Sequence, residues 1–138
     1  MRKETPISTI MSKHVIALTR SDDLEHAEKL FKKHKIRHIP VVSAENVIGM
    51  LSYSDLLRIC QTDVADDDHN VDSVVYNMFT IEQVMTKNVT SISSKTTIKE
   101  AAEILASRGF HALPIVDDCL LTGIVTTTDL LNYFIRQY

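Results

Sequence analysis

Apolar and polar positions follow the same sequence of spacings twice along the 138-residue chain. In the first half, a short apolar run at 15–18 is followed by a segment with apolar residues on one helical face. Apolar runs at 39–42 and 47–51, separated by a polar turn, then predict two strands, and a helix is predicted from about 54 to 59. The predicted face of the earlier helix consists of Leu24, Ala27, Leu30 and Phe31.

The second half repeats these elements after a shift of 74 residues, which places Pro40 on Pro114, Gly49 on Gly123 and Asp55 on Asp129. Self-similarity at a fixed shift is the mark of a structural repeat, and three matches of special residue types in one register are hard to obtain by chance. The corresponding elements are a short strand at 89–92, a helix with Ile98, Ala101, Ala102 and Leu105 on one face, strands at 113–116 and 121–125, and a helix from 128 to 135.

Helix starts are indicated by capping-box spacings, in which a hydroxyl or carboxylate is followed three residues later by an acid. Asp22 with Glu25 and Thr97 with Glu100 have this spacing before the earlier helix of each half. We therefore expect each helix to begin at these residues.

One βαββα unit alone would leave a three-stranded sheet with an uncovered apolar face, whereas two units can cover each other. The predicted fold class is α+β, with two βαββα repeats packed with pseudo-twofold symmetry into one module. The expected boundaries are 7–61 for the first repeat, 62–79 for an acidic linker and 80–136 for the second repeat.

The linker carries acidic residues and no Lys or Arg, which indicates a solvated segment, with a helix expected from Asp72 onward. A divalent-cation site is the alternative, but the segment has neither EF-hand spacing nor a glycine. The acidic residues concerned are Asp63, Asp66, Asp67, Asp68 and Asp72.

Net charge and cysteine content exclude several classes of function. A formal charge of −3 gives no basic surface of the kind that nucleic-acid binding requires, and we expect no nucleic-acid partner. The two cysteines, Cys60 and Cys119, form neither a disulfide framework nor a metal site by spacing, and a His34–His38 zinc pair is not expected. No apolar run approaches a membrane span and the first residues lack a signal-peptide core, so a cytoplasmic protein without a membrane partner is expected.

Two segments, each present twice, give the chain a specific resemblance. These are the strands around Pro40 and Pro114, and the pattern Gly-x-x-Ser/Thr-x-Ser/Thr-Asp that ends at Asp55 and at Asp129. They resemble the CBS-domain family, in which a tandem pair forms a Bateman module, and here the module would be stand-alone. The resemblance implies two clefts between the repeats that bind AMP, ADP, ATP, S-adenosylmethionine or a related adenosyl ligand, and association into disc-shaped dimers.

The resemblance assigns the ribose hydroxyls to Asp55 and Asp129, and carboxylates accept such hydrogen bonds strongly. Hydroxyls at a strand-to-helix junction favour an anion such as phosphate, although Ser52 with Asp55 and Thr126 with Asp129 also have capping-box spacing. A combined capping and ligand role is expected for these junctions. The phosphate candidates at the junctions are Ser52, Ser54, Thr126 and Thr128.

Basic residues before the prolines, Arg37, His38 and His111, match family positions that meet phosphate, and strand-edge structural roles are the alternative. The second repeat has Ala112 where the first has His38, so a doubly basic second site is in doubt. Gly49 and Gly123 are expected to let the backbone bend or approach the ligand. Residues matching the family's base pocket, which core packing would also explain, are Ser12, Ile16, Ile36, Thr86, Thr90 and Phe110.

No catalytic constellation, phosphate-binding loop or dinucleotide fingerprint is evident, and neither cysteine has an obvious activating partner in the sequence. We therefore expect no enzyme activity, no catalytic residues, no metal and no required cofactor. The expected function is a regulatory nucleotide sensor, with Mg²⁺ accompanying the nucleotide as an option, that signals through a homodimer or an unidentified protein partner. The alternative is a ligand-free scaffold for dimerisation or protein interaction.

Overall fold

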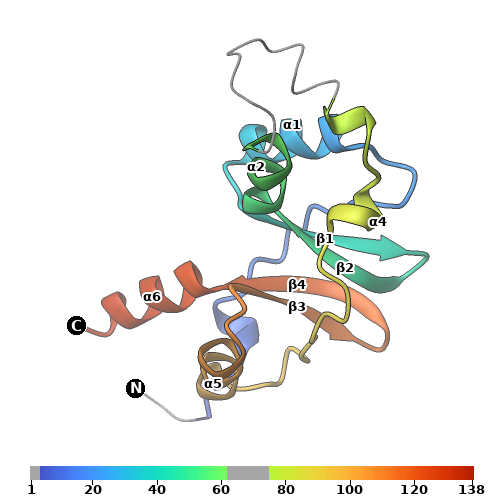
Figure 1. The fold of residues 1–138 in the computed structure, drawn as a ribbon. Coiled ribbons are helices and arrows are strands. Elements are labelled where there is room, and N and C mark those ends of the chain that lie inside the picture. Colours follow the sequence, from blue (N-terminus) through green and yellow to red (C-terminus); the bar gives the residue numbers. More distant parts are fainter. Residues whose placement is uncertain (1–3, 62–74) are drawn as a thin grey trace. The chain divides into compact units, whose positions relative to one another are not determined.

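The computed structural model describes residues 4–61 and 75–138. The chain forms an α+β fold with two similar sets of elements (Figure 1). By contacts it divides into two compact units: unit 1 contains the residues up to Val15 together with Thr90–Tyr138, and unit 2 contains Ile16–Val89.

The helices and hairpin strands occur where the apolar pattern predicts them. In unit 2 they are α1 (Leu24–His34), β1 (His38–Ser43), β2 (Asn46–Ser52) and α2 (Tyr53–Gln61). In unit 1 they are α5 (Ile98–Arg108), β3 (Ala112–Asp117), β4 (Leu120–Thr126) and α6 (Thr127–Arg136). Two shorter elements, η1 (Ile7–Thr9) and α4 (Ile81–Val84), precede the repeated set.

Each unit contains an antiparallel hairpin with the same register. His38 pairs with Ser52 at one end of β1–β2, and Ala112 pairs with Thr126 at the equivalent end of β3–β4. Both hairpins have an irregularity at the same place, between Val41 and Val42 in β1 and between its counterparts in β3. The sequence repeat is therefore also a repeat of backbone pairing.

The predicted first strands at 15–18 and 89–92 are wrong, because only Leu18 and Ile92 pair, as isolated parallel bridges. Leu18 lies between two bonds, donating to the Pro40 carbonyl and accepting from Val42 N–H at 2.9 and 2.8 Å. Extending the ladder from Leu18 back to Ile16 would require an N–H donor at position 40. Proline has none, so Pro40, and Pro114 in the other repeat, end the pairing after one residue.

The segment that precedes each of these two bridges lies in the compact unit that does not contain the bridge. Ser12 exchanges two backbone hydrogen bonds with Ile124 of β4, at 2.9 and 3.0 Å. Thr86 exchanges two with Met50 of β2, at 3.0 and 2.9 Å. The compact units therefore differ from the sequence repeats, because the residues leading into each repeat complete the sheet edge of the unit that contains the other hairpin.

The two predicted helix faces form the centre of the two cores. Leu24, Ala27 and Phe31 of α1 are buried with strand residues of unit 2, and Leu30 is partly buried against them. Ile98, Ala101 and Leu105 of α5 are buried in the same way in unit 1. No helix among the described residues is long and apolar enough to cross a membrane.

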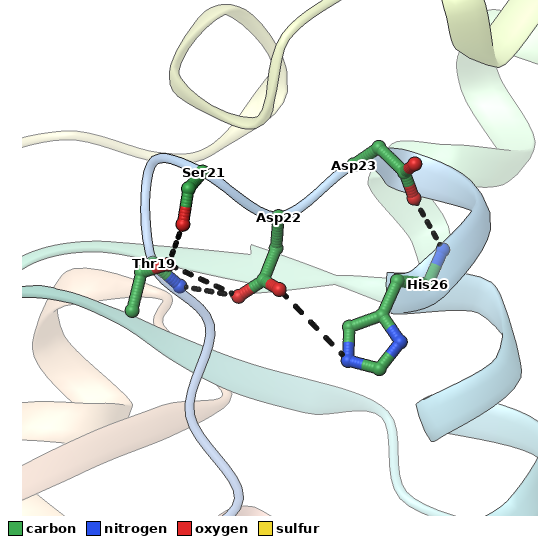
Figure 2. Close-up of polar contacts among 5 residues, drawn as sticks. All are labelled: Thr19, Ser21, Asp22, Asp23 and His26. Atoms are coloured by element: carbon green, nitrogen blue, oxygen red, sulfur yellow. Dashed lines mark hydrogen bonds and ion pairs between the residues drawn. The ribbon is translucent and has the colours of Figure 1, made fainter.

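The Thr97–Glu100 capping box is confirmed, but the one expected at Asp22 is not. Asp23 caps α1 by accepting from His26 N–H at 2.8 Å, as Figure 2 shows. Asp22 instead accepts from Thr19 N–H at 2.8 Å in the preceding turn. The carboxylate of Asp22 is thereby held in a local turn, a competing use that short acidic side chains often find.

Gly49 and Gly123 serve methionine packing, which differs from the expected approach of a ligand. A Cβ on Gly49 would meet the side chain of Met85, with Cγ at 2.9 Å. A Cβ on Gly123 would lie 2.7 Å from Met11 Sδ and 3.0 Å from the Ser12 carbonyl oxygen. The space that these glycines leave is thus filled by the segments that cross between the units.

Replacing Gly123 by Ala should destabilise the protein by about 1–3 kcal/mol, the usual range for overpacking. The measurement is the free energy of unfolding from urea denaturation. Because the carbonyl of Ser12 cannot move aside as a side chain can, Gly123→Ala should cost more than Gly49→Ala.

A double-mutant cycle with Met11→Ala isolates the contact. The cost of Gly123→Ala should fall in the Met11→Ala background, because Met11 supplies the closest atom. Equal costs in the two backgrounds would show that the methionine does not limit this position.

Candidate functional site

The ribose and phosphate candidates of the first repeat lie together at one end of the β1–β2 hairpin. His38 opens β1 opposite Ser52, the last residue of β2. The N–H of Tyr53 donates to the Arg37 carbonyl at 2.9 Å, which fixes the start of α2 beside the start of β1. Basic and hydroxyl candidates that are far apart in sequence are therefore neighbours, as a common phosphate-binding role would require.

Ser52 and Asp55 form the reciprocal cap that their spacing predicts. Asp55 N–H donates to Ser52 Oγ at 3.1 Å, and Ser52 N–H donates to Asp55 Oδ2 at 3.0 Å. Asp55 is buried, with 5% of its surface exposed. The carboxylate thus has a structural role at the helix start before any ligand is considered.

Arg58 is a participant that the sequence argument missed. Its guanidinium donates to Asp55 Oδ1 and forms an ion pair with it, while the Arg58 side chain is 72% exposed. The three-residue spacing of opposite charges on a helix was the available signal. A ribose that binds Asp55 must therefore share this carboxylate with Arg58 or displace it.

The second repeat has the same cap without the arginine. Asp129 N–H donates to Thr126 Oγ1 at 3.2 Å, and Thr126 N–H donates to Asp129 Oδ2 at 2.8 Å. The position equivalent to Arg58 is Asn132. Asp129 is half-buried and forms no ion pair among the described residues, so the two caps differ in charge although they share their geometry.

His111 takes the place of Arg37 in the second repeat, as the alignment predicts. Its carbonyl accepts from the N–H of Thr127 at 3.0 Å and from the Thr127 hydroxyl at 3.3 Å. Arg37 and His111 are exposed and His38 is half-buried, while Ser54 and Thr128 face solvent in the first turns of α2 and α6. These side chains reach the surface of their unit, so a ligand can contact them.

The residues matched to a base pocket divide between the units in a way that the sequence did not indicate. Thr86 joins the edge of β2 through Met50 and therefore belongs with Asp55, whereas Ser12 joins β4 and belongs with Asp129. Ile16 and Ile36 pack partly buried on the unit 2 core, and Phe110 does so in unit 1.

Thr90 lies in unit 1, where its hydroxyl accepts from Arg108 at 3.2 Å. The linker aspartates considered as a cation site lie outside the described residues, and so does the expected start of a helix at Asp72. Residues 75–77, which are described, are helical. Among the described side chains, no group of three His, Cys, Asp or Glu residues is arranged to hold a metal ion.

Several relatives are longer proteins, and this chain matches only part of their length. Protein MJ1225 of Methanocaldococcus jannaschii is 28% identical over 93% of this chain, and the match spans 46% of that protein. Its crystal structure superimposes with a TM-score of 0.78 over 97% of this chain and 49% of that one. A homoserine O-acetyltransferase of Methanohalobium evestigatum is 26% identical over 91% of this chain, but the match spans only 23% of the enzyme.

A comparison over the full length is given by the CBS domain pair of protein MJ0100, crystallised with 5′-methylthioadenosine and S-adenosyl-L-methionine. It is 25% identical, with a TM-score of 0.80 over 97% of this chain and 98% of that one. The family model of the CBS domain matches residues 7–61 and again residues 81–136. With both repeats matched, the chain belongs to the CBS domain family.

Proposed function

We propose that this chain is a regulatory module that binds an adenosine-containing ligand, AMP, ADP, ATP or S-adenosylmethionine, at the β2–α2 and β4–α6 junctions. The observation that carries the proposal is the repeated hydroxyl–carboxylate cap at a helix N-terminus, with a basic residue tied to the same junction by a backbone bond. The same class of ligand is named for the CBS domain pair of protein MJ0100.

Each part of such a ligand has a suitable group. The carboxylates of Asp55 and Asp129 would accept hydrogen bonds from ribose hydroxyls. A phosphate would be met by junction hydroxyls and N–H groups at the start of a helix, where the helix dipole favours an anion. Phosphate would also meet Arg37 and His38 in one unit and His111 in the other. The base would contact the partly buried apolar residues matched to the base pocket, such as Ile36 and Phe110.

The output of the module would arise from linkage between ligand and conformation. A ligand that binds one arrangement of the molecule more tightly than another shifts the population toward it, by no more than that difference in affinity. We propose that the shift is transmitted through a homodimer or a protein partner, and that the module regulates rather than catalyses. The acetyltransferase relative, matched over 23% of its length, is one arrangement in which a similar segment accompanies a catalytic protein.

A scaffold without ligand is the second candidate function, and Arg58 is the observation that favours it. Its ion pair already neutralises Asp55, so the first-repeat junction is satisfied by the protein itself. Asp129 is not neutralised in this way, which is why we favour ligand binding at least at the second repeat.

A panel of adenosine ligands should raise the melting temperature if the proposal is correct. At about 100 times the Kd, a ligand adds roughly 2.7 kcal/mol to stability, which corresponds to several °C for a domain of this size. The measurement is thermal unfolding with AMP, ADP, ATP, S-adenosylmethionine, NAD and cyclic dinucleotides, with and without Mg²⁺. A flat response at millimolar ligand concentration, from folded protein, would favour the scaffold.

Replacing Asp129 by Asn should weaken the binding of the active ligand about 10- to 100-fold, because a charge-assisted hydrogen bond contributes about 1.5–3 kcal/mol. Asp55→Asn should weaken it less, since Arg58 already occupies that carboxylate. Affinities come from isothermal titration calorimetry.

Asp23→Asn is the matched control, because Asp23 also caps a helix but belongs to the start of α1 and to neither junction. It should leave the affinity unchanged. Asparagine retains an oxygen that can accept the cap hydrogen bond in all three variants. If the Asp55→Asn, Asp129→Asn double variant binds as tightly as the wild type, the assignment of the ribose to these carboxylates is wrong.

A further inference from the structure

The two strand-to-helix junctions share their backbone geometry but differ in the charge around their carboxylates. In unit 2, Asp55 is paired with the guanidinium of Arg58. In unit 1, Asn132 stands in the place of Arg58, and Asp129 forms no ion pair among the described residues. If both carboxylates meet a ribose, the charge around each one decides which chemical group the ligand can carry beside that ribose.

Arg58 has the capacity to hold Asp55 and a ligand anion at the same time. Its Nη2 atom donates to Oδ1 of Asp55, and a guanidinium carries several further N–H donors in a planar fork. The Arg58 side chain is 72% exposed, so a ligand at the surface can reach it. Asp55 Oδ2 accepts from Ser52 N–H, and a carboxylate has more acceptor positions than these two bonds use. Ribose hydroxyls and an anion can therefore both be accommodated.

Further positive charge lies on the segment that leads into β1. Lys35 and Arg37 are exposed there, and the Arg37 carbonyl accepts from Tyr53 N–H at the start of α2. The second repeat has Gly109 and His111 at the positions of Lys35 and Arg37. The approach to the first junction is therefore richer in permanent positive charge than the approach to the second.

Other cations of the two repeats do not reverse this difference. The segments that complete the sheet edges contribute one exposed lysine to each unit, Lys87 in unit 2 and Lys13 in unit 1. Arg108 of the second repeat replaces His34 of the first, but its guanidinium donates to the hydroxyl of Thr90 at 3.2 Å. The first junction thus remains the more positive of the two.

We propose that the two junctions select different classes of adenosine ligand, an inference that rests on the proposed function. The first junction, with Arg58 and Arg37, takes an adenosine whose 5′ group is a phosphate, because a guanidinium forms strong charge-assisted bonds to phosphate. The second junction takes an adenosine whose 5′ group is uncharged or positive, a thioether or a sulfonium. A phosphate there would be repelled by Asp129 without a paired cation to offset the repulsion, whereas a sulfonium would be attracted.

Arg58 is the specificity-determining residue in this scheme. The start of α6 already has an anion in Asp129, so the preference of the helix dipole for negative charge is met by the protein. At the start of α2 the same preference is met by Asp55, and Arg58 adds a positive charge that a second anion can use. One residue therefore separates a junction that accepts a phosphate from one that disfavours it.

The test is a pair of reciprocal substitutions, Arg58→Asn and Asn132→Arg, which exchange the residues of two equivalent positions. AMP and 5′-methylthioadenosine are the probes, because they share the adenosine and differ in the 5′ group. In isothermal titration calorimetry the wild type should bind AMP at one site per chain. Arg58→Asn should weaken AMP at least tenfold and leave the affinity for 5′-methylthioadenosine unchanged, whereas Asn132→Arg should create a second AMP site.

Two variants guard against a loss of folding. Arg58→Asn leaves the buried carboxylate of Asp55 without its partner, so Arg58→Lys, which keeps the charge, should restore most of the AMP affinity. Asn132 is exposed, so Asn132→Arg tests the gain of a site without disturbing a core. Circular dichroism checks that each variant is folded.

AMP binding by the wild type at two equal sites, or an AMP affinity unchanged by Arg58→Asn, would overturn the division of ligands and leave the proposed function standing. If neither probe bound to the folded wild type, the proposed function itself would be contradicted, and the division of ligands with it.

Discussion

At the end of each hairpin, reciprocal hydrogen bonds between a hydroxyl and a carboxylate connect the last strand to the helix that follows it. Ser52 with Asp55, and Thr126 with Asp129, end a strand and begin a helix within three residues. The same bonds hold each carboxylate in one orientation at a helix N-terminus. Under the proposed function, the residue that stabilises the turn is also the one that a ribose or phosphate would meet, so capping and binding would be two uses of one arrangement.

The second constraint is the exchange of segments between the units. Ser12 completes the edge at Ile124, and Thr86 completes the edge at Met50. Gly123 and Gly49 make room for the methionine that precedes each of these residues. Neither sequence repeat can form its full set of contacts alone, and this explains why the family occurs here as a pair. It also means that each candidate site draws residues from both repeats of the sequence.

The sequence predicted most of the fold because its evidence was local. Apolar spacing identified four helices and four hairpin strands, and the shift of 74 residues identified the repeat. The first strands were predicted wrongly because ladder length depends on a missing N–H at Pro40 and Pro114, residues that are distant in sequence. The grouping of Thr86 with Asp55 could not be predicted, because it depends on which sheet edge the crossing segment joins. Arg58 was within reach, since its spacing from Asp55 is local.

The positions at which the two repeats differ are more informative about function than the positions at which they agree. Among the shared residues, Pro40 limits the strand pairing, Gly49 makes room for a methionine and Asp55 caps a helix, so their repetition follows from the fold. The exchange of Arg58 for Asn132 has no such requirement, and it changes the charge at one of the two junctions. Under the proposed function, two junctions with equal geometry but different charge would bind the ligand with different affinities. Two repeats with the same backbone arrangement thus come to differ through substitutions at exposed or partly exposed positions.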